Sequence, residues 1–279
     1  MIIVADSGST KADWAVVKAD GAHDIINTIG FNPVYHKESL IYDETSKAFT
    51  GKIPVEEVEA VYYYGTGCWD TQKKGVIAAA LQHLFGKANV LVEHDLVGAA
   101  RAACGKSPGI ACIIGTGSNS CAFDGDQVTD NVTNLGYFIG DEGSGSHLGK
   151  ELVKAYFYRE LPKELHNKFD ERYPGGKAII LENVYQKPTP NVFLAKYTRF
   201  LNDHSDHPFI QKIIYNCFSE FIDRHVRKYK NHLSLPISFI GSVAFHFKPF
   251  LEAILEERDM KLGKFVKRPI DALVEFHSA

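Results

Sequence analysis

Residues 2–17, IIVADSGSTKADWAVV, and residues 111–125, ACIIGTGSNSCAFDG, carry the same pattern. When the two stretches are laid over each other at a constant offset of 109 positions, Asp6 falls on Gly115. Each copy is an apolar strand, a tight turn of Gly, Ser and Thr, and a second apolar strand. The repeat predicts an α/β chain of two comparable domains that each present one such hairpin. The predicted domains span residues 1–106 and 107–279.

Other segments predict the remaining framework. Apolar runs that end at glycine or acidic residues predict further strands over residues 59–64, 89–93 and 236–240. Asp70 is expected to cap the helix that follows it. A long helix is predicted over residues 208–230, with Asp206 and an early proline as its start signal.

The composition is that of an ordinary globular protein. The chain has 279 residues, of which 45% are apolar and 23% charged, and a net charge of −3. This balance argues against a disordered chain and makes nucleic acid a poor first partner. No apolar run reaches 18 residues and the N-terminus lacks a signal-peptide pattern, so we expect no membrane partner and a cytoplasmic location. The five cysteines form no C-x-x-C pair and are expected to be free thiols.

Three carboxylates come at the ends of apolar strands or beside glycine turns. They are Asp6, Asp95 and Asp141. Turns of Gly, Ser and Thr let backbone N–H groups approach an anion closely. Carboxylates hold a hard cation such as Mg²⁺, and one carboxylate away from the metal can take a proton from a hydroxyl. Together these features predict phosphoryl transfer.

These motifs resemble those of the actin-like ATPase superfamily, and most closely the BadF/BadG/BcrA/BcrD ATPase family with its N-acetylglucosamine kinase-like members. The resemblance implies two ribonuclease H-like domains with an interdomain cleft, ATP and Mg²⁺ as cofactors, and a sugar as substrate. The matching segments are the first phosphate motif Asp6–Lys11, the second phosphate motif Gly115–Asn119, the Gly-Asp-Glu-Gly-Ser element at residues 140–144, and the adenosine motif Phe239–Ala244.

The resemblance also implies a role for each matched residue. Asp95 would be the general base for the sugar 6-hydroxyl, and Asp6 and Asp141 would hold the metal ion. The residues implied for the nucleotide are Ser9, Thr10, Lys11, Gly115, Thr116, Gly117, Ser118, Gly241, Ser242 and Ala244. Those implied for the sugar are Asn32, Gly65, Thr66, Asp95, Thr116, Gly136 and Asp141. The implied reaction is ATP-dependent phosphorylation of an amino sugar, N-acetylglucosamine, to its 6-phosphate.

Two positions depart from the family pattern. Leu135 stands where animal N-acetylglucosamine kinases carry a tryptophan over the sugar, so we expect the sugar preference to differ there. The C-terminal segment, residues 271–277, is short, and we expect it to dock on the N-terminal domain.

Two other functions stay open at this point. One is an ATPase activator of a reductase, the branch of the same family that holds an iron–sulfur cluster between two chains. The other is a non-catalytic sensor of sugar or nucleotide. A homodimer is compatible with each of these readings.

Overall fold

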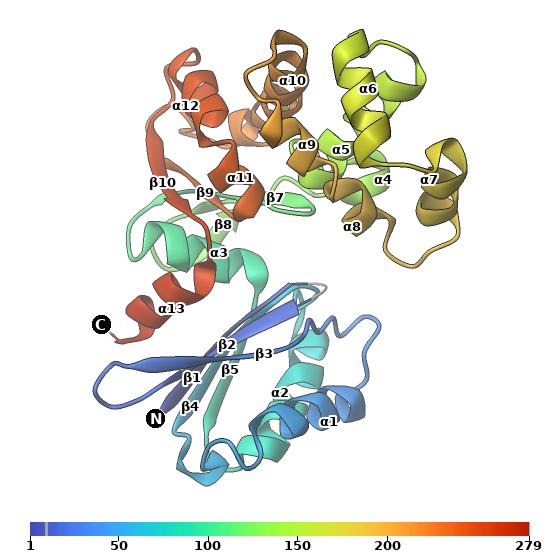
Figure 1. Cartoon of the computed structure of the whole chain (residues 1–279). Coiled ribbons are helices and arrows are strands. Elements are labelled where there is room, and N and C mark those ends of the chain that lie inside the picture. The colour runs from blue at the N-terminus through green and yellow to red at the C-terminus, as the bar shows by residue number, and fades with distance from the viewer. Residues whose placement is uncertain (9–10, 279) are drawn as a thin grey trace. The chain divides into compact units, whose positions relative to one another are not determined.

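The computed structural model describes all residues except Ser9, Thr10 and Ala279. The chain divides into two compact units (Figure 1). Unit 1 comprises residues 1–107, 125–128 and 268–279, and unit 2 comprises residues 108–124 and 129–267. Among the described residues, no helix combines the length and the apolar character needed to cross a membrane.

Unit 1 is built on a five-stranded mixed sheet. Its strands, in spatial order, are β3 (His23–Ile29), β2 (Lys11–Val17), β1 (Ile2–Ser7), β4 (Ala60–Gly65) and β5 (Asn89–His94). β1, β2 and β3 are antiparallel neighbours, whereas β1, β4 and β5 run parallel. Because parallel strands end at the same edge, the chain leaves β1, β4 and β5 on one side of the sheet.

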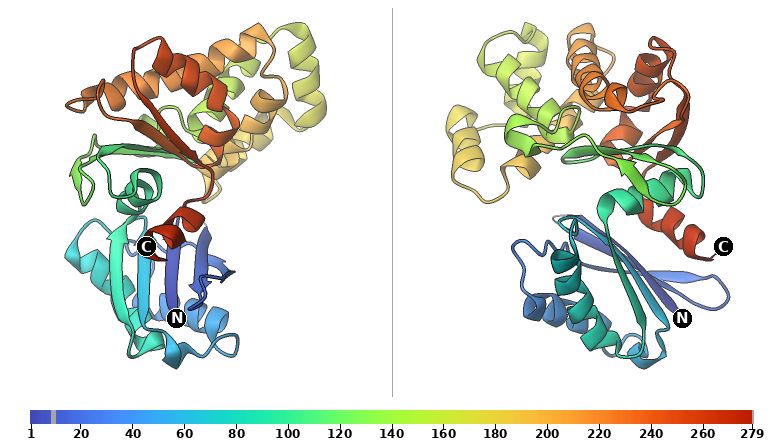
Figure 2. Two further views of the ribbon diagram at one scale, coloured as in Figure 1. Left: turned by 90° about the vertical axis from the view of Figure 1, so that its left-hand side faces the viewer. Right: turned by 180° about the vertical axis from the view of Figure 1, so that it is seen from behind.

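Helices cover both faces of this sheet. Figures 1 and 2 show α1 (Glu38–Phe49) and α2 (Thr71–Phe85) on one face. Ile3 and Ala5 belong to the core beneath these helices, while Val4 belongs to the core on the opposite face. This alternation is the two-residue period of a strand that is buried on both sides. The opposite face is covered by α3 (Asp95–Cys104) and α13 (Pro269–Ser278).

Unit 2 repeats the strand order of unit 1. Its sheet runs β8 (Val128–Asp130), β7 (Ser118–Phe123), β6 (Gly109–Ile114), β9 (Ile237–Ile240) and β10 (Leu262–Val266). β6 and β7 form an antiparallel hairpin, and β9 and β10 add in parallel, as β4 and β5 do in unit 1. The repeat that the sequence shows therefore corresponds to one shared sheet topology.

Unit 2 is richer in helix than unit 1. Figure 2 shows its helices gathered on one side of the sheet, where they enclose a large apolar core. The helices are α4 (Gly136–Ile139), α5 (Gly145–Phe157), α6 (Lys163–Arg172), α7 (Gly176–Tyr185), α8 (Pro190–Ala195), α9 (Thr198–Asp203), α10 (Pro208–Arg224), α11 (Ser242–His246) and α12 (Lys248–Glu256). Short 3₁₀ turns occur at Val55–Glu57 in unit 1 and Val226–Lys228 in unit 2.

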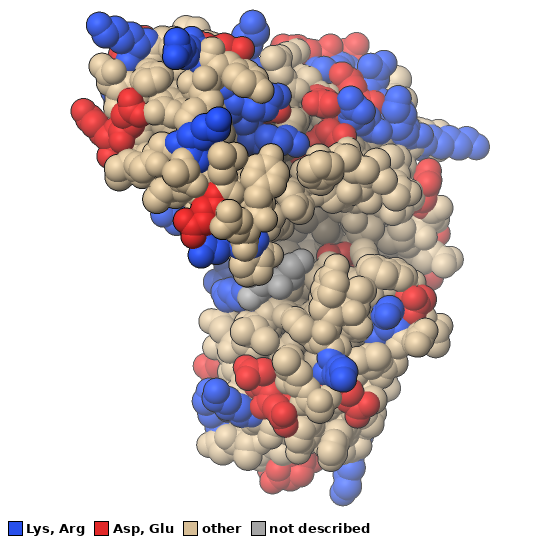
Figure 3. Space-filling view, turned by 90° about the vertical axis from the view of Figure 1, so that its right-hand side faces the viewer, with Lys and Arg blue, Asp and Glu red and all other residues tan. Residues whose placement is uncertain are grey.

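The surface carries charges of both signs. On the face shown in Figure 3, acidic and basic side chains alternate across broad uncharged areas. This distribution agrees with the small net charge of −3.

Candidate active site

In unit 1, the parallel strands bring two carboxylates to one edge of the sheet. Asp6 near the end of β1 is in register with Tyr64 of β4, and Tyr64 is in register with Glu93 of β5. Asp95 follows β5 directly, at the first position of α3. Residues that are 89 positions apart in the chain therefore meet because three parallel strands end together.

The two carboxylates repel one another electrostatically. The pKa of Asp6 is raised from 3.8 to about 7, mainly by burial and then by the negative charges of Asp95 and Asp13. The ammonium of Lys11 opposes this shift but lies 2.6 Å from Asp13, with which it forms an ion pair. A divalent cation beside Asp6 would stabilise its charged form, so the donor chemistry fits Mg²⁺.

Asp95 carries an oxygen with no donor. Its Oδ1 is buried and accepts no hydrogen bond from the residues that the structure describes. The neighbouring His94 Nδ1 is 2.9 Å away and accepts the Leu96 N–H at 3.2 Å. A buried carboxylate oxygen without a hydrogen-bond donor destabilises the folded protein, because it has lost its hydration. Such an oxygen is available to accept a proton from a ligand.

A loop around Asn32 adjoins this edge. Phe31 N–H donates to Ser7 Oγ at 3.1 Å, and Thr66 N–H donates to the Ser7 carbonyl at 3.1 Å. Gly67 has a φ of +80°, and a Cβ there would lie 2.4 Å from Asn32 Oδ1. The close approach thus requires glycine at position 67. The Asn32 amide N–H₂ and the Thr66 hydroxyl make no hydrogen bonds within the described part of the chain, so both can bind a ligand hydroxyl.

In unit 2, the β6–β7 turn presents free backbone donors. Gly115 N–H donates to the Gly117 carbonyl, whereas the carbonyls of Gly115 and Thr116 accept from Gly145 N–H at 2.8 Å and Ser146 N–H at 3.0 Å. The N–H groups of Thr116 and Gly117 donate to no acceptor in the residues that the structure covers. The start of α5 holds the turn in place and leaves these two donors for an anion.

Asp141 is anchored to the same turn. Its Oδ1 accepts from Ser118 N–H at 3.2 Å and from the Asn134 amide at 2.7 Å, and its backbone has a φ of +57°. Burial raises its pKa, and the Ser118 and Asn134 hydrogen bonds oppose that shift. The other carboxylate oxygen of Asp141, Oδ2, lies close to Gly117. A Cβ added at Gly117 would be 2.9 Å from this oxygen.

The segment predicted to contact adenosine also borders the turn. Gly241 has a φ of +114°, and a Cβ there would lie 2.6 Å from the Ile114 carbonyl oxygen. Ser242 begins α11, and Ala244 is fully buried. Gly241 therefore passes directly against the end of β6, beside the free N–H groups of the turn.

The structure groups the predicted residues within each unit as follows. Unit 1 holds Asp6, Lys11, Asn32, Gly65, Thr66 and Asp95, and unit 2 holds Gly115, Thr116, Gly117, Ser118, Gly136, Asp141, Gly241, Ser242 and Ala244. The Lys11 side chain forms an ion pair with Asp13. Ser9 and Thr10 lie outside the described residues.

Sequence reasoning missed Asn134 as a site residue. Its amide donates to Asp141 Oδ1 and to the Ser118 carbonyl, and its own Oδ1 accepts from Gly136 N–H. One side chain thus ties the β7 strand, the Asp141 carboxylate and the start of α4 together. The only sequence signal was an asparagine seven positions before an aspartate, a spacing that matches no regular element.

Known structures share this architecture. A putative N-acetylglucosamine kinase from Porphyromonas gingivalis is 40% identical, with a TM-score of 0.93 over 99% of this chain and 98% of that chain. The chain belongs to the N-acetylglucosamine kinase-like family. A putative N-acetylglucosamine kinase from Chromobacterium violaceum has 16% identity and a TM-score of 0.74 over 99% of this chain and 98% of that chain.

More distant structures share the fold alone. The ROK hexokinase from Thermus thermophilus is 16% identical, with a TM-score of 0.52 over 99% of this chain and 97% of that chain. No protein-family model and no curated protein matched the chain. The predicted α/β fold of the actin-like ATPase and sugar kinase superfamily is confirmed by these neighbours and by the two five-stranded sheets.

Proposed function

We propose that the chain is an ATP-dependent sugar kinase that phosphorylates N-acetylglucosamine on its 6-hydroxyl. The observation that carries this proposal is Asp95 Oδ1, a buried carboxylate oxygen without a hydrogen-bond donor. The 40% identical P. gingivalis protein, whose name specifies this kinase, supports the choice of sugar. The same assignment implies a cytoplasmic enzyme, because ATP is its phosphate donor.

Asp95 acts as the general base. It accepts the proton of the sugar 6-hydroxyl while the hydroxyl oxygen forms a bond to the γ-phosphorus of ATP. The bond between that phosphorus and the β–γ bridging oxygen breaks, and ADP leaves. The absence of a competing donor on Asp95 Oδ1 keeps this oxygen available for the sugar hydroxyl.

The phosphates are held mainly by backbone groups of unit 2. Thr116 and Gly117 direct free N–H groups outward from the β6–β7 turn, and Ser118 follows them. Gly241, Ser242 and Ala244 would contact the adenosine. Because neutral N–H groups and a metal ion bind the triphosphate, the protein needs no excess of basic residues.

Mg²⁺ would be held by Asp6, with Asp141 as a further oxygen ligand or as a partner of a bound water. The ion, when bound, neutralises charge on the transferring phosphoryl group. No cluster of three or more His, Cys, Asp or Glu side chains occurs in the described residues. A small number of carboxylates is what Mg²⁺ uses, because it keeps several waters and binds substrate phosphates.

Unit 1 offers two polar groups for the sugar. The Asn32 amide N–H₂ group and the Thr66 hydroxyl make no hydrogen bonds within the described residues, and Gly65 lies at the end of β4. Gly136 and Asp141 would contact further hydroxyls. Leu135, whose side chain is 59% exposed, would face the acyl group of the sugar.

A coupled assay of ADP release tests this function. The panel contains glucose, glucosamine, N-acetylglucosamine, N-acetylmannosamine and N-acetylmuramate, each with Mg²⁺ and ATP. We expect kcat/KM to be highest for N-acetylglucosamine. ADP release that does not depend on any sugar of the panel would contradict the kinase assignment, whereas a preference for another sugar would change only the substrate.

A further inference from the structure

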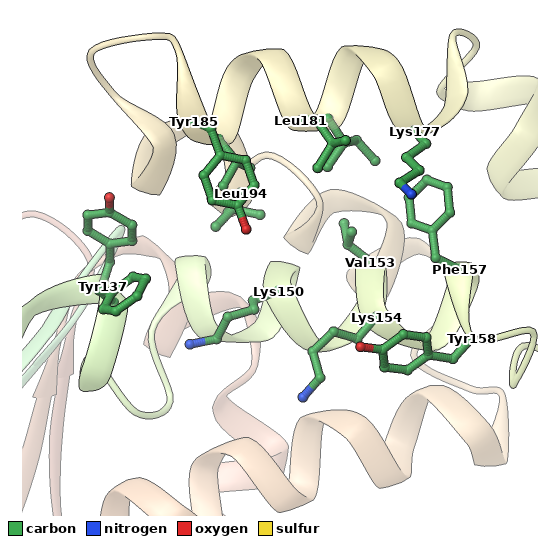
Figure 4. Close-up of a pocket in the computed structure, with 13 residues that line it drawn as sticks. Tyr137, Lys150, Val153, Lys154, Phe157, Tyr158, Lys177, Leu181, Tyr185 and Leu194 are labelled. Atoms are coloured by element: carbon green, nitrogen blue, oxygen red, sulfur yellow. The ribbon is translucent and has the colours of Figure 1, made fainter.

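An apolar pocket of about 560 Å³ lies in unit 2, and none of the residues assigned above lines it. Figure 4 shows helices α5 and α7 as its two long walls, with Tyr137 at one end. This volume is in the range of small-molecule sites in proteins. Leu194 and Val153 contribute to its floor and walls.

The walls of the pocket expose much apolar surface. Leu181 is 41% exposed, Tyr185 is 75% exposed, and Phe138 is 78% exposed. Large side chains exposed singly are common, but three that surround one concavity form an apolar patch. Such a patch gains free energy when an apolar group displaces water from it.

All charged side chains of the lining are cationic. Three lysines line the pocket, Lys150, Lys154 and Lys177, and no Asp or Glu does so. Lys154 forms an ion pair with Glu151 at 2.8 Å, and Figure 4 shows its side chain pointing away from α7. Lys150 and Lys177 form no ion pair within the described residues, and Figure 4 shows the Lys177 ammonium beside Phe157.

We propose that this pocket binds an amphipathic monoanion, such as a medium-chain carboxylate. The chain of the ligand would lie between α5 and α7, and its anionic end would meet Lys177, beside Phe157. An apolar chain alone would leave the Lys177 ammonium without a counter-charge, because Lys177 forms no ion pair within the described residues. Complementary charge and apolar shape together therefore define the ligand class.

The first test uses two dyes that share one ring system. Anilinonaphthalene sulfonate carries a negative charge, and N-phenyl-1-naphthylamine lacks it. In a fluorescence titration of the full chain, we expect one anionic dye per chain. Lys177→Gln should weaken the anionic dye about tenfold, the loss of one hydrogen bond to a charged group, and change binding of the neutral dye less than twofold. Lys168→Gln, on α6 and outside the pocket, is the control.

The second test fills the pocket. Leu181→Trp should abolish binding of both dyes, whereas Leu40→Trp, at a residue of similar exposure in α1, should not. Octanoate should displace the anionic dye at about tenfold lower concentration than octan-1-ol, because only octanoate carries the charge that Lys177 binds. Equal weakening of both dyes by Lys177→Gln, or binding that survives Leu181→Trp, would overturn the proposal.

Two further outcomes would also contradict the proposal that the pocket binds an amphipathic monoanion. If Leu181→Trp converts a dimer to a monomer in sedimentation, a second copy of the chain covers this surface. If N-acetylglucosamine or ATP displaces the dye competitively, the pocket is part of the kinase site. Because these titrations need no turnover, they are independent of whether the proposed kinase activity is found.

Discussion

The C-terminal helix α13 should make the stability of unit 1 depend on pH through His277. The His277 ring stacks on Tyr62, with ring centroids 3.7 Å apart and an interplanar angle of 15°. Its Nε2 lies 2.8 Å from the Tyr64 hydroxyl, which also accepts a hydrogen bond from Arg101 at 2.8 Å. Burial, and secondly the charge of Arg101, lower the pKa of His277 from 6.5 to about 4.

The sign of the effect follows from proton binding. Between pH 6.5 and pH 4, His277 is protonated in the unfolded chain but neutral in the folded one. The unfolded state therefore binds more protons in this window, and the free energy of unfolding falls as the pH falls. At about 1.4 kcal/mol per pKa unit the full shift corresponds to about 3 kcal/mol. The ring is only partly buried, and solvent screening reduces our expectation to about 1–2 kcal/mol.

Tryptophan fluorescence during urea unfolding measures this effect directly. The two tryptophans, Trp14 and Trp69, both lie in unit 1, so their emission reports the unit that contains His277. His277→Phe keeps the stacked ring but cannot be protonated. The free energy of unfolding of the native protein minus that of the variant should fall by about 1–2 kcal/mol between pH 7 and pH 4.5. A difference that stays constant over this range would refute the reasoning.

Three further predictions concern the site. Gly67→Ala should raise the KM for sugar about tenfold, because its Cβ would lie 2.4 Å from a side-chain amide oxygen, whereas Gly51→Ala, with a similar φ of +77° and no close neighbour, should not. Asn134→Ala should lower kcat/KM about 10- to 100-fold, since Asp141 loses a hydrogen bond to its charged form; unchanged kinetics would exclude a positioning role. Asp6→Asn should raise the Mg²⁺ concentration for half-maximal rate at least about tenfold in a metal titration.

The sequence predicted those parts of the fold that follow from local patterns. The repeated hairpin appears as β1–β2 in unit 1 and β6–β7 in unit 2, and Asp70 caps α2 by accepting the Lys73 N–H at 2.7 Å. Strand periodicity and cap chemistry act over a few residues, so they can be recognised without tertiary information.

α10 begins at Pro208 as predicted, but its cap and its C-terminal end differ from the prediction. Asp206 was expected as the start signal, but His207 is the N-cap, and its side chain accepts the Phe209 N–H at 3.1 Å. The helix ends at Arg224 rather than at Lys230, because the chain tightens into a 3₁₀ turn at Val226–Lys228. That turn places His225 3.0 Å from Glu142, a tertiary contact that no local pattern shows.

The candidate site residues could be named from the sequence, but their contacts could not. Glycine turns and strand-end carboxylates can be read along the chain. The roles of Gly67 and Asn134 depend on which side chain lies opposite, Asn32 for the first and Asp141 for the second. Such pairings arise when separate strands and loops pack together, so a single sequence does not reveal them.

The base assignment is the central claim, and Asp95→Asn tests it most directly. The kcat for N-acetylglucosamine phosphorylation should fall about 10³-fold, as expected for the loss of a general base. The dissociation constant of the sugar, measured by calorimetry, should change less than about threefold, because asparagine keeps the shape of the side chain. Asp20→Asn, in the exposed turn after β2, is the matched control and should keep full activity. An Asp95→Asn enzyme with kcat within tenfold of the native value would contradict the account.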